Sequence, residues 1–214
     1  MKGIAFFSGG KDGLYATYLA ENQGIDVSYL LLFNTTIGIS PHYENIDSLK
    51  KIARSMKKEL FVFDMKNGSK ELAKFIKSFG VSHIIGGDIY LEAHFEWIDR
   101  LAKESNTIAL EPLWKKDSFE LTKEMIGHGF VYSIIAVDKG KLSKDWLGYT
   151  FINSDDLKNF AYKTGVDPAG EGGEFHTVVL ESPLFDSSFE IKSTDFEESD
   201  RYFYLKFNLK EVKK

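Results

Sequence analysis

A glycine-rich segment near the N-terminus carries the residue types that bind phosphate. Ser8-Gly9-Gly10-Lys11-Asp12-Gly13 follows an apolar run and precedes a helical pattern. Glycines in this setting let backbone N–H groups approach an anion, and the positive end of a helix dipole favours negative charge. The Lys11 ammonium can reach phosphate oxygens, and the Asp12 carboxylate can hold Mg²⁺ between phosphates. We expect both side chains to lie on an exposed loop.

The spacing of this segment matches neither GxxxxGK[ST] nor GxGxxG. It is therefore a phosphate loop of another type, unless it is a plain glycine-rich turn. Its position at the first strand–helix junction favours the phosphate loop.

A second candidate segment places two carboxylates among glycines in the other half of the chain. Residues 170–177 read GEGGEFHT and contain Glu171 and Glu174. A flexible acidic loop contributes little to a hydrophobic core, so we expect these carboxylates to bind or to catalyse. We predict that the loop folds over the carboxyl ends of the first and fourth strands and faces the phosphate loop and Asp88.

Gly87 and Asp88 are further candidates, because Gly86-Gly87-Asp88-Ile89 follows the fourth predicted strand. Ligands of open α/β sheets bind at the carboxyl ends of strands. The alternative is an ordinary turn in which Asp88 caps the next helix. Three histidines lie in or beside predicted elements and show no metal-ligand spacing. We interpret them as structural or surface residues; they are His83, His94 and His128.

Strand and helix patterns alternate through the first hundred residues, which predicts a parallel sheet with helices on both faces. The continuous apolar run VSYLLLF at 27–33 is typical of a strand buried on both faces. The expected strands are 3–7, 27–33, 60–63, 82–85 and 107–110, and the expected helices are 11–23, 46–56, 72–79 and 91–103.

The second half has another rhythm and predicts a smaller α+β domain. Helices are expected at 118–128 and 155–163, and strands at 130–137, 175–180, 189–192 and 201–209. In the last strand, apolar residues alternate with Tyr, Lys and Asn, as in a half-exposed antiparallel strand. This change of rhythm predicts two domains, residues 1–108 and residues 109–214.

The composition excludes several classes of protein. The chain has 214 residues, no cysteine and a formal net charge of −5. Without cysteine there is no disulfide, zinc–thiolate site or cysteine nucleophile. The acidic balance argues against general nucleic-acid binding. The N-terminal apolar run is too short for a signal peptide or a membrane span, so we expect a soluble cytoplasmic protein.

Several motifs together carry a family resemblance. SGGKD resembles the SGGxDS pyrophosphate loop of the N-type ATP pyrophosphatases, except that Gly13 replaces the final serine. With GGDI, EPLW (111–114), WLG (146–148), GEGGEFHT and SPLF (182–185), residues 3–185 look like the diphthine–ammonia ligase family. The resemblance implies a HUP-like, Rossmann-type ATP pyrophosphatase domain.

This family resemblance also implies a reaction. ATP activates the carboxylate of diphthine, a modified histidine on translation elongation factor 2, as an acyl-adenylate, and ammonium then gives diphthamide. The expected products are AMP and pyrophosphate. The expected cofactors are ATP and Mg²⁺, with Asp12 as the metal ligand. The expected catalytic residues are Lys11, Asp12, Glu171 and Glu174, and the expected ATP-binding residues are Ser8, Gly9, Gly10, Lys11, Asp12, Gly13, His42, Gly87 and Asp88.

Other expectations follow from the same resemblance. Relatives that thiolate tRNA or take nitrogen from glutamine commonly use cysteine, so its absence favours free ammonium. The expected partners are the diphthine-bearing elongation factor and ammonium, without direct nucleic-acid or membrane binding, and with a homodimer as one arrangement. Diphthine carries a quaternary ammonium, which aromatic faces bind well. The aromatic residues proposed for that pocket are Trp114, Trp146, Tyr149 and Phe175.

Two alternatives stay open. One is an adenine-nucleotide-binding module that has kept the loop without the ligase activity, for which Gly13 leaves room. The other is an ATP-dependent ligase that acts on a different carboxylate. His42 follows the second strand, where relatives contact adenosine, but it can equally be a solvated loop residue.

Overall fold

The first half of the chain forms a parallel five-stranded sheet. The computed structural model describes residues 1–34 and 40–213. The sheet has the strand order β3-β2-β1-β4-β5, and all of its neighbouring strands are parallel. Its elements are β1 (Lys2–Phe6), α1 (Lys11–Asn22), β2 (Asp26–Asn34), α2 (Ile46–Ser55), β3 (Glu59–Asp64), α3 (Gly68–Ser78), β4 (His83–Ile85), α4 (Glu92–Ser105) and β5 (Ile108–Leu110), with 3-10 turns at Tyr43–Asn45 and Met65–Asn67.

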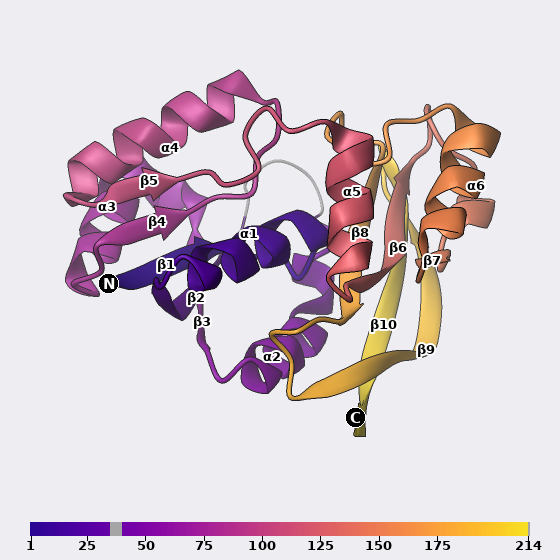
Figure 1. The fold of residues 1–214 in the computed structure, drawn as a ribbon, viewed down its shortest axis with the longest axis horizontal. Helices are drawn as coiled ribbons and strands as arrows, with labels where there is room; N and C mark the ends of the chain where they lie inside the picture. Colours follow the sequence, from indigo (N-terminus) through magenta and orange to yellow (C-terminus); the bar gives the residue numbers. More distant parts are fainter. Residues whose placement is uncertain (35–39, 214) are drawn as a thin grey trace.

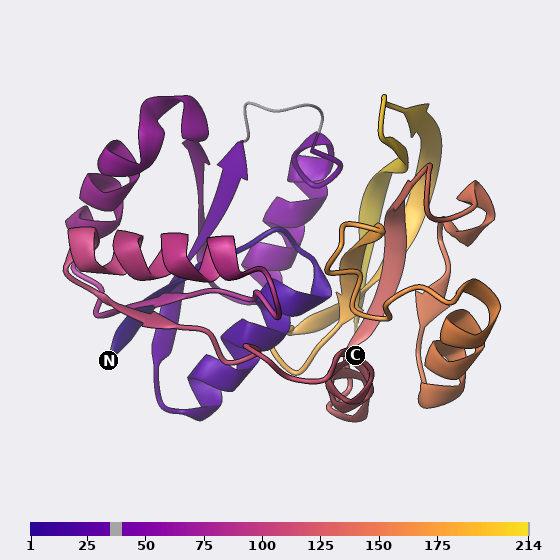
Figure 2. The same ribbon diagram turned by 90° about the horizontal axis from the view of Figure 1, so that it is seen from above.

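Helices cover both faces of this sheet (Figures 1 and 2). Helices α3 and α4 pack on one face around a buried cluster that includes Leu72 and Leu101, while α1 and α2 lie on the other. The predicted α/β class is therefore confirmed. The strand order reverses at β1, between β2 and β4, and ligands of such sheets bind at the carboxyl ends of the strands there.

The second half forms an antiparallel sheet with two helices, as predicted for an α+β unit. Strand β6 pairs with β7, β8 and β10, and β10 pairs with β9 from Phe203 to Lys213. The elements are α5 (Ser118–Gly127), β6 (Val131–Asp138), a 3-10 turn (Lys144–Trp146), β7 (Thr150–Phe151), α6 (Ser154–Thr164), β8 (Phe175–Glu181), β9 (Ser187–Glu198) and β10 (Tyr202–Lys213).

One hydrophobic core runs across the two halves. Leu14 and Tyr15 of α1 belong to the same buried cluster as Phe130, which precedes β6, and Tyr132 of β6. The rings of Tyr15 and Phe130 meet edge to face, with centroids 5.2 Å apart. The division at residue 108 stays a prediction, and β5 itself continues to Leu110.

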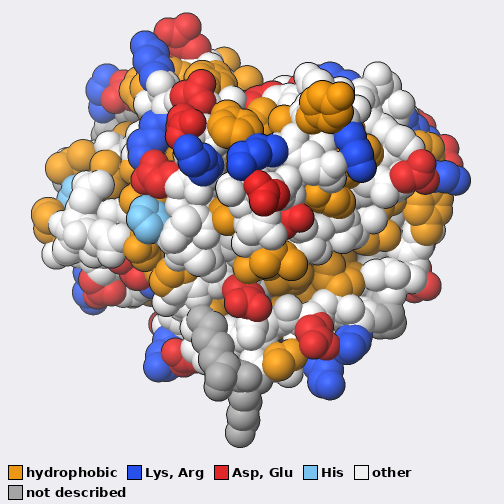
Figure 3. Space-filling view, turned by 45° about the vertical axis from the view of Figure 1, so that its right-hand side comes forward, with side chains coloured by type: hydrophobic (Ala, Val, Ile, Leu, Met, Phe, Trp, Pro, Cys, Tyr) orange, Lys and Arg blue, Asp and Glu red, His pale blue; other side chains and the backbone are white. Residues whose placement is uncertain are grey.

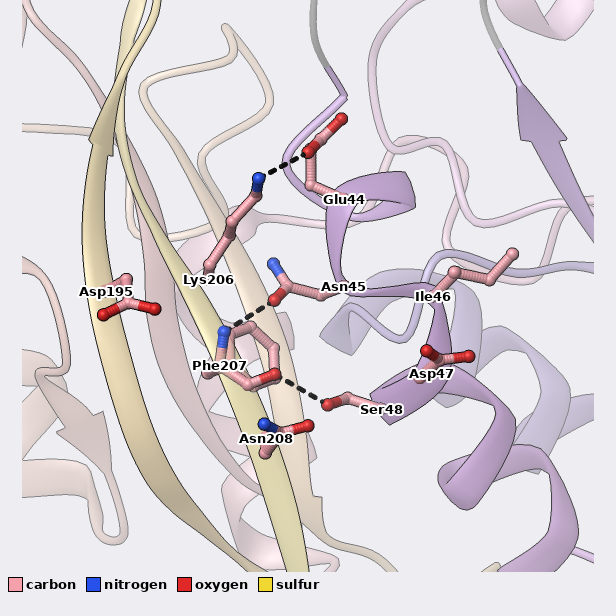
Figure 4. Close-up of a pocket in the computed structure, with 9 residues that line it drawn as sticks. All are labelled: Glu44, Asn45, Ile46, Asp47, Ser48, Asp195, Lys206, Phe207 and Asn208. Carbon is pink, nitrogen blue, oxygen red and sulfur yellow. Dashed lines mark hydrogen bonds and ion pairs between the residues drawn. The ribbon is translucent and has the colours of Figure 1, made fainter.

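Helix α2 also holds the edge of β10 with polar side chains (Figure 4). The Asn45 side chain, which is buried, donates to the Leu205 carbonyl at 2.8 Å and accepts from the Phe207 N–H at 2.7 Å. The Ser48 hydroxyl donates to the Phe207 carbonyl at 2.9 Å. The two side chains therefore replace a neighbouring strand for this part of β10.

The face of the second half carries an apolar hollow between β6–β7 and β9 (Figure 3). Its volume is about 450 Å³, and Leu147, Leu180, Phe189 and Leu205 are among its lining residues. None of the helices in the described part of the chain is both long and apolar enough to cross a membrane.

Candidate active site

The phosphate loop joins β1 to α1 at the reversal point of the parallel sheet. Gly10 is the N-cap of α1 and provides no side-chain cap. Gly9 has φ +78°, and a Cβ there would lie 2.4 Å from the Leu49 Cδ2 atom. The loop therefore needs glycine both for its backbone conformation and for its close packing on α2.

The predicted contact between the two candidate loops is confirmed. The Thr177 hydroxyl accepts a hydrogen bond from the Lys11 N–H at 3.2 Å, and the Val179 N–H donates to the Gly9 carbonyl at 2.9 Å. A cavity of about 260 Å³ lies between the loops. Its lining includes Ser8, Gly10, Lys11, Asp12, Gly13, His42, Leu91, Ala169, Gly170, Glu171, Gly173, Phe175, His176 and Thr177.

Lys11 corrects the expectation of an exposed loop. Its side chain is only 2% exposed. The ammonium contacts both oxygens of the Asp12 carboxylate, at 2.8 and 3.0 Å, and donates to the Ala169 carbonyl. The expectation was wrong because residues 169–177 fold over the loop, and the sequence pattern of the first half cannot show this cover.

Asp12 lines the cavity with its side chain 27% exposed. Burial raises the pKa of its carboxyl, and the nearby Asp88 carboxylate adds to this, while the Lys11 cation lowers it. Among the described residues, no group of three or more acidic or imidazole side chains is placed to hold a metal ion. The donor set fits a Mg²⁺ ion that takes its remaining ligands from phosphates and water.

Glu171 connects the acidic loop to the carboxyl end of β4. Its Oε2 atom accepts from the Ile89 and Tyr90 N–H groups at 3.2 and 3.4 Å. Burial raises the pKa of its carboxyl, and the Asp12 carboxylate adds to the shift. Glu171 thus lines the cavity with its carboxylate near that of Asp12, as the sequence predicted for its position.

Glu174 lies differently. Its Oε1 atom pairs with the Lys141 ammonium at 3.0 Å, and Lys141 also donates to the Gly172 carbonyl at 2.9 Å. Glu174 is not among the residues that line the cavity. The structure therefore shows a contact that holds the loop to the β6 end, and the catalytic role of Glu174 stays a prediction.

The GGDI segment packs on the backbone of the phosphate loop without space for a side chain at Gly87. A Cβ at Gly87 would lie 2.8 Å from the Asp12 carbonyl carbon and the Gly13 nitrogen. Asp88 does not cap α4, whose N-cap is Leu91. The Asp88 carboxylate instead meets the His94 Nδ1 atom at 2.9 Å and raises the pKa of that imidazole.

Glu111, which follows β5, is a residue of this region to which the sequence assigned no role. Its carboxyl packs on Gly86, where a Cβ would lie 2.1 Å from Oε1. Both carboxyl oxygens are buried without a well-formed hydrogen bond. Burial raises the pKa of Glu111 to about 8, and the Asp88 carboxylate adds to this shift. The EPLW motif was the available signal, but burial depends on tertiary contacts.

A second, more apolar cavity lies on the α4 side of the carboxyl ends. Its volume is about 380 Å³, and its lining is mostly aromatic and aliphatic, with Asp88 and His94 as its polar members. The rings of Phe6, Phe33 and Trp97 contact one another, with centroids 4.9 to 5.9 Å apart. Asp88 is thus shared between an aromatic cavity and the neighbourhood of Asp12.

The aromatic residues proposed for a quaternary ammonium do not all line one cavity, although Trp146 and Tyr149 contact each other. Trp146 and Tyr149 pack on Phe160 in the interior of the second half. Trp114 stacks on Phe95 with ring centroids 4.5 Å apart. Of the four, Phe175 alone lines the cavity at the phosphate loop, where the Lys11 ammonium lies 5.6 Å from its ring centroid.

Comparisons with known proteins agree along nearly the whole chain. A family model described as the diphthamide synthase N-terminal domain matches residues 1–108, and one described as the diphthamide synthase C-terminal domain matches residues 117–214.

Curated relatives share the name diphthine–ammonia ligase. The Schizosaccharomyces pombe protein is 28% identical over 131 residues, which cover 58% of this chain and 22% of that protein. The Mus musculus protein is 32% identical over 100 residues, which cover 46% of this chain and 38% of that protein. The Bos taurus protein is 30% identical over 128 residues, which cover 58% of this chain and 48% of that protein. The matched region thus spans less than half the length of these relatives.

Two solved structures share a general likeness. One is the predicted subunit of a tRNA methyltransferase from Methanocaldococcus jannaschii, with a TM-score of 0.46 and 15% identity, covering 84% of this chain and 96% of that one. The other is a 4-thiouridine synthetase in complex with RNA and ATP, with a TM-score of 0.42 and 14% identity, covering 84% and 55%.

Proposed function

Because the chain belongs to the diphthamide synthase family, we propose that it is an AMP-forming ligase that amidates diphthine on translation elongation factor 2. The observation that carries the proposal is the cavity in which the N-terminus of α1, Lys11, Asp12 and Glu171 meet. A carboxylate resists attack by ammonia because its leaving group is poor, and adenylation supplies a better one.

ATP fits the two cavities if its phosphates and its base separate. The first-turn N–H groups of α1 and the loop glycines favour the phosphates. The aromatic cavity beside Asp88 suits the adenine, because a planar base stacks on such rings and a carboxylate can accept from a ribose hydroxyl. In this proposed arrangement, Gly87 and Asp88 would lie between the base and the phosphates.

The residues of the chain have distinct parts in the proposed reaction. Lys11 exchanges its bonds to Asp12 and Ala169 for phosphate oxygens and stabilises charge on the departing pyrophosphate. Asp12, with Asp88 beside it, would hold Mg²⁺, which neutralises phosphate charge when bound. Glu171 holds the ammonium beside the α-phosphate, with Glu174 supporting its loop.

The proposed chemistry has two steps. An oxygen of the diphthine carboxylate attacks the α-phosphorus, and pyrophosphate leaves with the electron pair of the broken P–O bond. Ammonia, formed when ammonium loses a proton, then attacks the acyl carbon. The C–O bond to AMP breaks, and the nitrogen loses a second proton to give the amide. Free ammonium serves as the nitrogen donor because the chain has no cysteine for a glutaminase site.

The decisive experiment incubates the protein with ATP, Mg²⁺, ammonium and purified diphthine-form elongation factor. We expect AMP and pyrophosphate as products and a mass change on the factor of roughly −1 Da, the acid-to-amide difference. ADP and phosphate would place the protein in another mechanistic class. If the protein binds ATP but does not consume it, the nucleotide-binding module is favoured. If it consumes ATP only in the presence of another carboxylic acid, a different carboxylate substrate is favoured.

A matched pair of variants tests the role of Lys11. Lys11→Met keeps most of the buried hydrocarbon stem and removes the charge, so we expect amide formation to fall at least about tenfold, since a charge-assisted contact is worth about 1.5–3 kcal/mol. Lys158→Met on α6 removes a cation that is exposed and paired with Asp155, and it should leave turnover unchanged. Normal turnover by Lys11→Met would overturn the loop assignment.

A further inference from the structure

We infer that His42 and His176 together form a phosphate-binding wall of the cavity and hold the pyrophosphate end of the nucleotide. The inference rests on the proposed use of ATP, and it assigns His42 to the phosphates rather than to adenosine. His176 belongs to the GEGGEFHT segment, yet neither the sequence nor the family resemblance assigned it a role.

The two imidazoles come from different halves of the molecule and meet beside the phosphate loop. His42 follows β2, and His176 lies on β8 next to Thr177. Their rings pack edge to face, with centroids 5.1 Å apart. The His42 Cε1 atom would lie 3.6 Å from a Cβ on Gly10. Both rings line the cavity, at the first turn of α1.

His42 has a buried polar atom that lacks a partner. Its Nδ1 atom is buried and makes no hydrogen bond, and no ion pair to a carboxylate is described for either imidazole. Leaving a buried polar atom without a partner is unfavourable, because the atom has lost its hydrogen bonds to water. A phosphate oxygen in the cavity would supply the missing partner, whereas the apolar base of a nucleotide would supply little.

The cations nearest His176, which are Arg201 and Lys11, favour an anion as this ligand, although the Asp12 and Glu171 carboxylates line the same cavity. Burial lowers the pKa of His42 to about 3, with the His176 ring adding to the shift and the Ser8 backbone opposing it. Burial lowers the pKa of His176 to about 4, and the Arg201 and Lys11 cations add to this. Both rings are therefore neutral in the free protein. A nearby negative charge favours the protonated form, so pyrophosphate binding should take up a proton.

The end of the chain supports this wall. The Tyr202 ring at the start of β10 packs on His176 with centroids 4.9 Å apart, and its hydroxyl donates to the Gly173 carbonyl at 3.4 Å. The Arg201 guanidinium lies 4.9 Å from the centroid of the Tyr202 ring. Tyr202 is thus a positioning residue that connects β10 to the cavity.

Calorimetry with inorganic pyrophosphate and Mg²⁺ tests the inference. Titrations at pH 7 in two buffers of different ionisation enthalpy give the number of protons taken up. We compare the wild type with the double variant His42→Gln and His176→Gln. Glutamine keeps an N–H donor but cannot be protonated, and the proton equilibria of the ligand cancel in the comparison.

We expect the wild type to take up clearly more protons than the double variant. We also expect the affinity of the variant to fall about tenfold at pH 6.5, equivalent to 1.4 kcal/mol, and to approach that of the wild type at pH 9. His128→Gln is the matched control, because His128 is exposed at the end of α5 and contacts Tyr15 outside the cavity.

Equal affinity and equal proton uptake in wild type and double variant would overturn the inference. Circular dichroism shows whether the double variant folds. If it does not fold, the inference is tested on the wild type alone. It is then overturned if the wild type takes up no more protons than the protonation change of pyrophosphate itself accounts for. A wild type that binds neither pyrophosphate nor ATP would overturn the proposed function, so the two failures are distinguishable.

Discussion

Buried charge is the common feature of the residues that surround the cavities. Lys11, Asp12 and Glu171 come from two loops, and each has a partner that offsets part of the cost of burial. Glu111 has no well-formed hydrogen bond to its buried carboxyl oxygens, and the Asp88 backbone and His94 offset the raised pKa only in part. A buried carboxyl without a partner stays protonated more readily than an exposed one, so Glu111 should couple the stability of the fold to pH.

Glu111→Gln tests this coupling, because glutamine resembles the protonated carboxyl. The pKa of Glu111 in the folded chain is raised to about 8. Its stabilising contribution is therefore complete below the unfolded value of about 4.3 and is lost as pH rises through about 8. In thermal unfolding, we expect the variant and the wild type to melt alike at pH 5. At pH 9 the variant should be more stable by at least about 1 kcal/mol, or ~2–4 °C.

Glu104→Gln, which changes an exposed glutamate of α4, is the control for this prediction and should show no pH-dependent difference. Identical melting temperatures of Glu111→Gln and wild type from pH 5 to pH 9 would mean that the Glu111 carboxylate is well solvated.

At the scale of elements, the carboxyl ends of β1 and β4 meet the start of α1 without space for side chains. Gly13 shows this most clearly, since a Cβ there would lie 2.8 Å from the Phe6 carbonyl oxygen. The family pattern has serine at this position. In this chain the packing of α1 on β1 provides a physical reason for glycine, independent of whether the activity is retained.

Gly13→Ser should consequently destabilise the protein instead of restoring a phosphate contact. Forcing extra atoms into a packed site costs typically about 1–3 kcal/mol, so we expect a lower melting temperature and no gain in ATP affinity. Gly127→Ser is the matched control, because a Cβ at the end of α5 meets nothing within 4 Å. A Gly13→Ser protein of normal stability that binds ATP more tightly would contradict the packing argument.

Elements with a clear hydrophobic periodicity could be predicted from the sequence. The bounds of strands at the exposed edge of a sheet were harder to predict. The run VSYLLLF at 27–33 indicated β2 because that strand is buried among neighbours. Strand β9 spans Ser187–Glu198, whereas the sequence predicted only 189–192. Its polar end, TDFEE, pairs with β10 on an outer strand, where solvent removes the apolar alternation. The two residues of β7 carry too little pattern to predict.

The site was predictable as a set of loops but not in its contacts. Glycines and carboxylates at strand ends indicated where the phosphate loop and the acidic loop would meet. The burial of Lys11 and the pairing of Glu174 with Lys141 depend on how the second half covers the first. No pattern within a single segment contains that information.

At the scale of the whole molecule, the cavity exists because the two halves are fixed against each other. The shared core around α1 provides one connection, and the contact of α2 with β10 provides another. Because residues 169–177 and Tyr202 belong to the second half, loosening this contact should disturb the cavity as well as the fold.

Asn45→Ala tests whether the halves unfold as one unit. The substitution removes the partners of the Pro41 and Leu205 carbonyls and of the Phe207 N–H. Each buried group left unsatisfied costs about 1–3 kcal/mol, so we expect the free energy of unfolding to fall by several kcal/mol.

Urea unfolding followed by tryptophan fluorescence and by circular dichroism should give one coincident transition at a lower midpoint. Asp47→Ala changes the neighbouring exposed side chain, which pairs with Lys50 at the surface, and should stay within about 0.5 kcal/mol of wild type. Two separate transitions in Asn45→Ala, with the first half retaining wild-type stability, would show that the parallel sheet folds independently of β10 and that the shared core does not couple the halves.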